Sequence, residues 1–128
     1  MPEGMDARYR ESFEAMKRML AVLVDEGIPV VAGTDAMPGF ALERELEIYA
    51  DAGLPPSKVL QIATLEAARV SGRAEELGVI ETGKLADLVL VDGDPTARIS
   101  DVRNVRMVVR GGLVYDPAKL CVELGIRP

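Results

Sequence analysis

Histidine is missing from this chain of 128 residues. It is the side chain that most often serves as a general base near neutral pH, and it is the commonest protein ligand for metal ions. A serine, cysteine or zinc hydrolase of the usual kinds is therefore hard to assemble from this chain by itself.

Cysteines and long apolar runs are also scarce. The single cysteine, Cys121, cannot form an internal disulfide, so nothing in the chain requires an oxidising compartment. No apolar run reaches the roughly 18 residues that a membrane span needs, and no membrane partner is predicted. The opening Met-Pro-Glu-Gly lacks the positive and apolar regions of a signal peptide. We therefore expect a cytoplasmic protein.

Aromatic residues make up 4% of the chain and tryptophan is absent, so aliphatic side chains and methionine have to build the core. The formal net charge is −6, which argues against nucleic acid as a partner, because phosphate binding needs a basic face. An apolar fraction of 48% and the length predict about one globular domain.

The first two elements are predicted as a helix followed by a buried strand. Apolar side chains step by four and three through residues 6–26, which predicts a helix that packs along one stripe and ends at Gly27. The stripe consists of Tyr9, Phe13, Met16, Leu20 and Leu23. Residues 28–32 are short, apolar and rich in valine, which favours a strand covered on both faces.

The segment Gly33-Thr34-Asp35 follows directly on that strand, and a further helix is predicted after it. In parallel sheets with this alternation of elements, ligands gather at the carboxyl ends of the strands, which places Asp35 where chemistry would be done. From spacing alone a structural role is favoured, because Thr and Asp are ordinary helix-capping residues.

Two more helices are predicted over residues 41–52 and 56–71. In the first, four charged residues are expected to point largely outward, namely Glu43, Arg44, Glu45 and Glu47. Glu43 and Glu47 have the spacing of paired catalytic carboxylates, but a solvated acidic first turn is favoured. The second has a small inner face at Ala63, Ala67 and Ala68, which predicts a close neighbour.

Strands dominate the rest of the chain. We expect them at residues 79–80 and 87–92, joined by a tight turn at Gly83-Lys84. Residues 102–110 and 113–115 are predicted to form a hairpin around Gly111-Gly112, and a helical turn is expected over residues 118–124. The change from helices to strands falls near residues 73–78.

Several phrases in this order resemble the C-terminal third of the metal-dependent amidohydrolase superfamily, in its imidazolonepropionase-like branch. The most specific is Gly83-Lys84-Leu85-Ala86-Asp87-Leu88-Val89, followed by Gly33-Thr34-Asp35. Ala63-Thr64 with Ala67-Ala68, and residues 106–115, also fit. The resemblance spans roughly residues 5–117.

The resemblance implies an α/β fold: the C-terminal part of a TIM (β/α)₈ barrel in residues 1–75, followed by strands of a small β-sandwich in residues 76–128. Members bind one or two divalent metals, usually zinc, through histidines on early strands. They hydrolyse C–N bonds of amides, cyclic amides or dipeptides. An aspartate at the end of the last barrel strand contacts the metal and moves the proton of the attacking water, and by position it corresponds to Asp35.

The chain also departs from that family. The histidines and the bridging lysine would lie upstream of Met1, a full barrel needs about 250 residues, and Glu43 stands where relatives often carry histidine. We therefore interpret the chain as a fragment that is inactive alone and binds an amide or dipeptide substrate only when complete. Alternatives are a non-catalytic module that forms homo-oligomers, or complementation by a separate chain carrying the missing barrel half. A strand ending at residue 33 is the structural sign that this lineage predicts.

Overall fold

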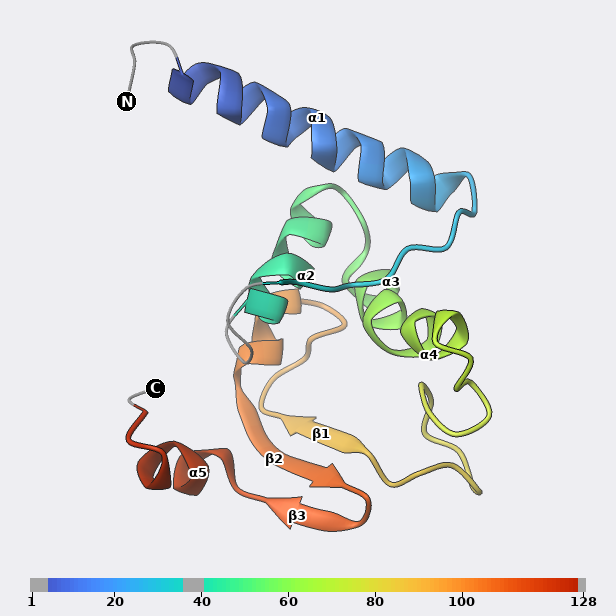
Figure 1. Ribbon diagram of the computed structural model, residues 1–128, viewed down its shortest axis with the longest axis vertical. Helices are drawn as coiled ribbons and strands as arrows, with labels where there is room; N and C mark the ends of the chain where they lie inside the picture. Colours follow the sequence, from blue (N-terminus) through green and yellow to red (C-terminus); the bar gives the residue numbers. More distant parts are fainter. Residues whose placement is uncertain (1–4, 36–40, 127–128) are drawn as a thin grey trace.

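The computed structural model describes residues 5–35 and 41–126 (Figure 1). Helix α1 and the sheet lie at opposite ends of the molecule, and α2, α3 and α4 lie between them. None of the helices in these two ranges has the length and apolar character to cross a membrane. In chain order the elements are α1 (Met5–Asp25), α2 (Ala41–Asp51), α3 (Pro56–Gln61), the π-helical turn η1 (Ile62–Glu66), α4 (Ala67–Val70), β1 (Leu88–Val91), the 3₁₀ helix η2 (Ile99–Arg103), β2 (Val105–Arg110), β3 (Leu113–Tyr115) and α5 (Pro117–Glu123).

Helix α1 confirms the first predicted helix to within one residue at each end. Gly27 ends it with φ +72°, and the N–H of Ile28 returns to the carbonyl of Leu23 at 2.9 Å. The apolar stripe, however, packs only at its C-terminal end, where Leu20 lies against the core. Tyr9, Phe13 and Met16 are 64%, 41% and 61% exposed. The prediction of a packed stripe is therefore wrong for the N-terminal half of α1.

Residues 28–35 do not form a strand, which corrects the prediction for residues 28–32. Val30 and Ala32 do pack against the core, as an apolar segment should. A β-strand needs a neighbouring chain to pair with, and the sheet in the described residues contains only β1, β2 and β3. The strand ending at residue 33, which the family resemblance predicted, is therefore not found. It would need a neighbouring strand that the described residues do not supply.

The two other predicted helices are confirmed. Leu46 and Tyr49 are buried on α2, and Pro56 opens the run α3–η1–α4 at a position suited to proline. Within that run, Val59 and Ile62 are the most deeply buried side chains.

The small inner face of that run meets a close neighbour, as predicted. The neighbour is the backbone of Gly78: a Cβ built there would lie 2.8 Å from the Cβ of Ala68 and 3.0 Å from the Cα of Leu65. Alanine side chains and a glycine allow the two backbones to approach this closely.

The strands form one antiparallel sheet in the order β1-β2-β3. Val89 pairs with Val108, and Val108 pairs with Tyr115. The predicted hairpin is confirmed for residues 105–110 and 113–115, but residues 102–103 belong to η2 and not to its first strand. Gly111 and Gly112 take positive φ values of 56° and 81°, as a type I′ turn requires. Residues 79–80 are not a strand, which is a correction; residues 74–84 run through turns instead. A second sheet layer is not seen in the described residues, so the β-sandwich stays a prediction.

One apolar core joins both halves of the chain. Ile99 of η2 is buried with Leu46 and Ile62, and Val102 packs against the same cluster. Beside it, Arg103 donates from Nε to Glu47 Oε1 at 2.6 Å and from Nη2 to Glu47 Oε2 at 3.1 Å. The division into residues 1–75 and 76–128 stays a prediction.

The Glu47–Arg103 ion pair should make stability depend on acid. Hydrogen bonds from Arg103, assisted by Arg44, lower the pKa of Glu47 from its ordinary 4.5 to about 2. The stabilisation is therefore present above about pH 4.5 and is lost as the pH falls towards 2. Because both side chains are partly exposed, we expect Glu47→Gln to cost about 1 kcal/mol at pH 7 and almost nothing at pH 2.

Thermal unfolding followed by circular dichroism between pH 7 and pH 2 measures this effect. Glu75→Gln, an exposed carboxylate elsewhere in the chain, is the matched control. Equal losses for the two variants at neutral pH would contradict the role given to the ion pair.

Candidate functional site

Asp35 lies at the end of the segment that links α1 to α2, and it is exposed to solvent. Its carboxylate is therefore accessible to water and to a ligand. Residues 36–40, which connect it to α2, lie outside the described residues. The structure thus places Asp35 in an accessible position, and its predicted role in catalysis and metal binding stays a prediction.

Two side chains of α2 hold the backbone just before Asp35. Glu45 Oε1 accepts a hydrogen bond from the N–H of Gly33 at 3.2 Å. The same oxygen accepts one from the Tyr49 hydroxyl at 2.7 Å, and that hydroxyl also lies 3.3 Å from the carbonyl oxygen of Val31. Burial, followed by the neighbouring Glu45 carboxylate, raises the pKa of Tyr49 well above its ordinary value, so the phenol stays protonated and donates.

These contacts correct the expectation that Glu45 points outward. The Glu45–Tyr49 spacing of four residues puts both side chains on one face of the helix, and this spacing was the available signal in the sequence. The sequence did not predict the hydrogen bond from the Gly33 N–H to Glu45, because nothing in the amino-acid pattern shows that this N–H faces α2.

Glu43 and Glu47 do not behave as solvated carboxylates either. Both are only partly exposed, and Glu47 is held by Arg44 and Arg103. Glu43 Oε2 is buried and has no hydrogen-bond partner among the residues described. Because two arginines engage one member, the pair is unsuited to the acid–base role that its spacing allowed.

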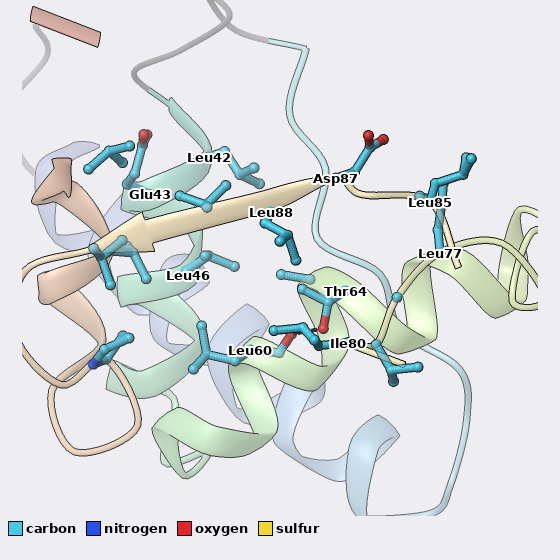
Figure 2. A pocket seen from close by; sticks show the side chains of 18 residues that line it. Leu42, Glu43, Leu46, Leu60, Thr64, Leu77, Ile80, Leu85, Asp87 and Leu88 are labelled. Carbon is cyan, nitrogen blue, oxygen red and sulfur yellow. Dashed lines mark hydrogen bonds between the residues drawn. The ribbon is translucent and has the colours of Figure 1, made fainter. Parts of the chain in front are cut away.

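An apolar groove of about 530 Å³ lies between α2, the α3–η1 run and β1 (Figure 2). Figure 2 shows Leu42, Leu46, Leu60 and Leu88 around this space. Glu43 and Thr64 contribute polar groups to its lining, and Asp35 does not line it. The groove therefore suits an apolar occupant and is separate from the candidate catalytic carboxylate.

The Gly83–Val89 phrase is structural in this fold. Lys84 Nζ donates to the carbonyl of Ala74 at 2.5 Å, which fastens the turn to the end of the helical half. Asp87 Oδ1 accepts from the N–H of Gly111 at 2.7 Å and so holds the turn between β2 and β3. The most specific motif of the resemblance therefore stabilises the fold through these contacts, which are structural and not catalytic.

The residues in hand do not make a metal site on their own. Among the described residues no three histidine, cysteine or acidic side chains come together as a ligand set. The chain has no histidine, and Asp35 offers a single carboxylate. A tight divalent-metal site takes three or four protein ligands, so the donor set of this chain alone does not fit one.

Comparison with known proteins confirms the family that the sequence resembles. A sequence profile described as "Amidohydrolase family" matches residues 9–114. The imidazolonepropionase of Geobacillus thermodenitrificans is 31% identical over 109 residues, which cover 78% of this chain and 26% of that protein. The imidazolonepropionase of Shouchella clausii is 37% identical over 112 residues, covering 81% of this chain and 24% of that protein.

Solved structures of related proteins support the same family. A Xaa-Pro dipeptidase crystallised with methionine in its active site superposes with a TM-score of 0.72 at 34% identity, over 80% of this chain and 25% of that one. The chain therefore spans about a quarter of the length of the relatives it matches. The α/β architecture is shared with these TIM-barrel proteins, and the profile covers most of the chain from α1 to β3. By sequence and by fold, the chain belongs to the amidohydrolase family, as a segment similar to part of the imidazolonepropionases.

Proposed function

We propose that this chain is the C-terminal segment of a metal-dependent amidohydrolase and that Asp35 takes part in hydrolysis when the enzyme is complete. The observation that carries the proposal is the anchored Gly33–Asp35 segment inside the family match. The substrate would be a small molecule with a C–N bond, such as a non-peptide amide, a cyclic amide or a dipeptide. The names of the relatives, imidazolonepropionase and Xaa-Pro dipeptidase, support this class.

The chemistry assigned to Asp35 is proton transfer. Its carboxylate would accept a proton from the attacking water and deliver it to the leaving nitrogen, so that water adds across the C–N bond to give an acid and an amine. A divalent metal, zinc by preference, would lower the pKa of the water. Most of its ligands would have to come from residues outside this chain.

The first test is an assay of the purified chain with zinc against dipeptides and N-acyl amino acids. We expect no hydrolysis and no tight zinc binding, because one carboxylate is too few ligands. Co-expression with a histidine-bearing upstream segment of a relative, followed by the same assays, should restore both. Hydrolysis by the chain alone would contradict the proposed dependence on missing ligands.

A second candidate is a non-catalytic module that associates with itself. It is favoured by the apolar surface that the described residues leave uncovered, on α1 and on both faces of the sheet. Exposed apolar surface of this extent marks an interaction site or an aggregation hazard. On α1 and the sheet, the most exposed of these side chains are Tyr9, Met16, Val89, Leu113 and Val114.

We expect light scattering at micromolar concentration to give a mass above the 13.8 kDa of one chain. The double variant Tyr9→Glu/Met16→Glu should shift the mass towards a monomer, because it places charges on the exposed half of the α1 stripe. The double variant Arg8→Glu/Arg18→Glu, which adds negative charge to α1 outside that stripe, is the matched control. A wild-type monomer at this concentration would contradict the second candidate.

A further inference from the structure

The segment before Asp35 has no sheet partner among the described residues, yet its backbone is bound at two points by one helix. Glu45 accepts a hydrogen bond from the N–H of Gly33, and the Tyr49 hydroxyl lies 3.3 Å from the carbonyl oxygen of Val31. The two side chains are themselves joined by the 2.7 Å hydrogen bond from the Tyr49 hydroxyl to Glu45. The three contacts form a closed network between α2 and residues 31–33.

We propose that Glu45 and Tyr49 are positioning residues. They hold the backbone of residues 31–33 against α2 and thereby fix the orientation of the Asp35 carboxylate. This inference rests on the proposed function of Asp35. It adds two residues that act through the backbone and do not touch the reacting atoms.

The rigidity of the network is what makes it suited to this role. Tyr49 is 9% exposed and belongs to the same buried cluster as Leu46, so its ring has little freedom. It delivers its hydroxyl to Glu45 from the next turn of α2. Hydrogen bonds to a carboxylate are about twice as strong as those between neutral groups. An acceptor fixed in this way restrains a backbone position only two residues before Asp35.

No competing partner of Glu45 is seen in the described residues. The basic neighbour Arg44 pairs with Glu47, and no ion pair in the described parts of the chain involves Glu45. Exchange of the Gly33 amide alone distinguishes this local anchoring from a general role of Glu45 in packing.

Gly33 has no positive φ, and a Cβ built there meets no atom of the described residues within 4 Å. Gly33→Ala therefore keeps the N–H donor without strain, and as a matched control it should leave this amide protected from exchange.

The test is hydrogen exchange of the Gly33 amide in the ¹⁵N-labelled 128-residue chain. Glu45→Ala should speed exchange at Gly33 about tenfold or more, the equivalent of losing one charge-assisted hydrogen bond, while the amides in the middle of α2 keep their rates. Glu45→Gln retains an acceptor oxygen and should restore most of the protection. Tyr49→Phe should give an intermediate loss, and Arg44→Ala should leave Gly33 unchanged.

Unchanged exchange at Gly33 in Glu45→Ala would overturn the inference, and so would an increase spread equally over α2. In an enzyme restored with an upstream segment, Glu45→Ala should lower kcat with little change in KM, and Glu45→Gln should recover much of it. If exchange responds as expected but Asp35→Asn leaves kcat unchanged, the proposed function fails while the anchoring stands. If Asp35→Asn abolishes activity and Gly33 exchange does not respond, only the anchoring fails.

Discussion

Replacing Gly78 by alanine should lower the free energy of unfolding by about 2–4 kcal/mol. Gly78 has φ +97°, a region that a residue with a Cβ occupies only under strain. The new methyl group would also lie 3.0 Å from the Cα of Leu65 and 3.3 Å from the carbonyl oxygen of Thr64. These are backbone atoms inside the α3–η1–α4 run, so relief requires the run and the following turn to separate.

Urea unfolding followed by circular dichroism measures this change, with Gly83→Ala as the matched control. Gly83 has nearly the same φ, +95°, but a Cβ built there meets no atom of the described residues within 4 Å. It should cost only the backbone term, about 1–2 kcal/mol. Equal losses in the two variants would show that the close approach at Ala68 does not limit stability.

The second large effect is expected from Asp35→Asn in a restored enzyme. The amide keeps the size of the side chain but cannot accept a proton, so kcat should fall about 10²- to 10⁴-fold, the usual contribution of general acid–base catalysis. The measurement is steady-state hydrolysis by a chimera in which residues 9–114 replace the matching segment of the Shouchella clausii imidazolonepropionase.

Asp51→Asn in the same chimera is the control, because Asp51 is an exposed carboxylate at the far end of α2. It should leave kcat within a factor of two. A chimera that keeps full activity with Asn at position 35 would remove Asp35 from the mechanism.

Local pattern determined most of the elements of this protein. The steps of three and four that run from Tyr9 to Leu23 predict α1, because helix formation depends on residues that are close along the chain. Gly111-Gly112 predicts the turn between β2 and β3, because only a residue without a Cβ takes positive φ at no cost. The motifs around Asp35 and Asp87, together with those in residues 63–68 and 106–115, identified the family.

Only the tertiary structure decided what those elements contact. Residues 28–32 read as a strand, but a strand exists only when a neighbouring chain accepts and donates its hydrogen bonds, and the described residues provide none. Glu45 and Glu47 read as solvated, but one binds the Gly33 backbone and the other binds Arg103, 56 residues away. A pairing between distant segments leaves no periodic trace in the sequence, because its two halves are brought together by the fold.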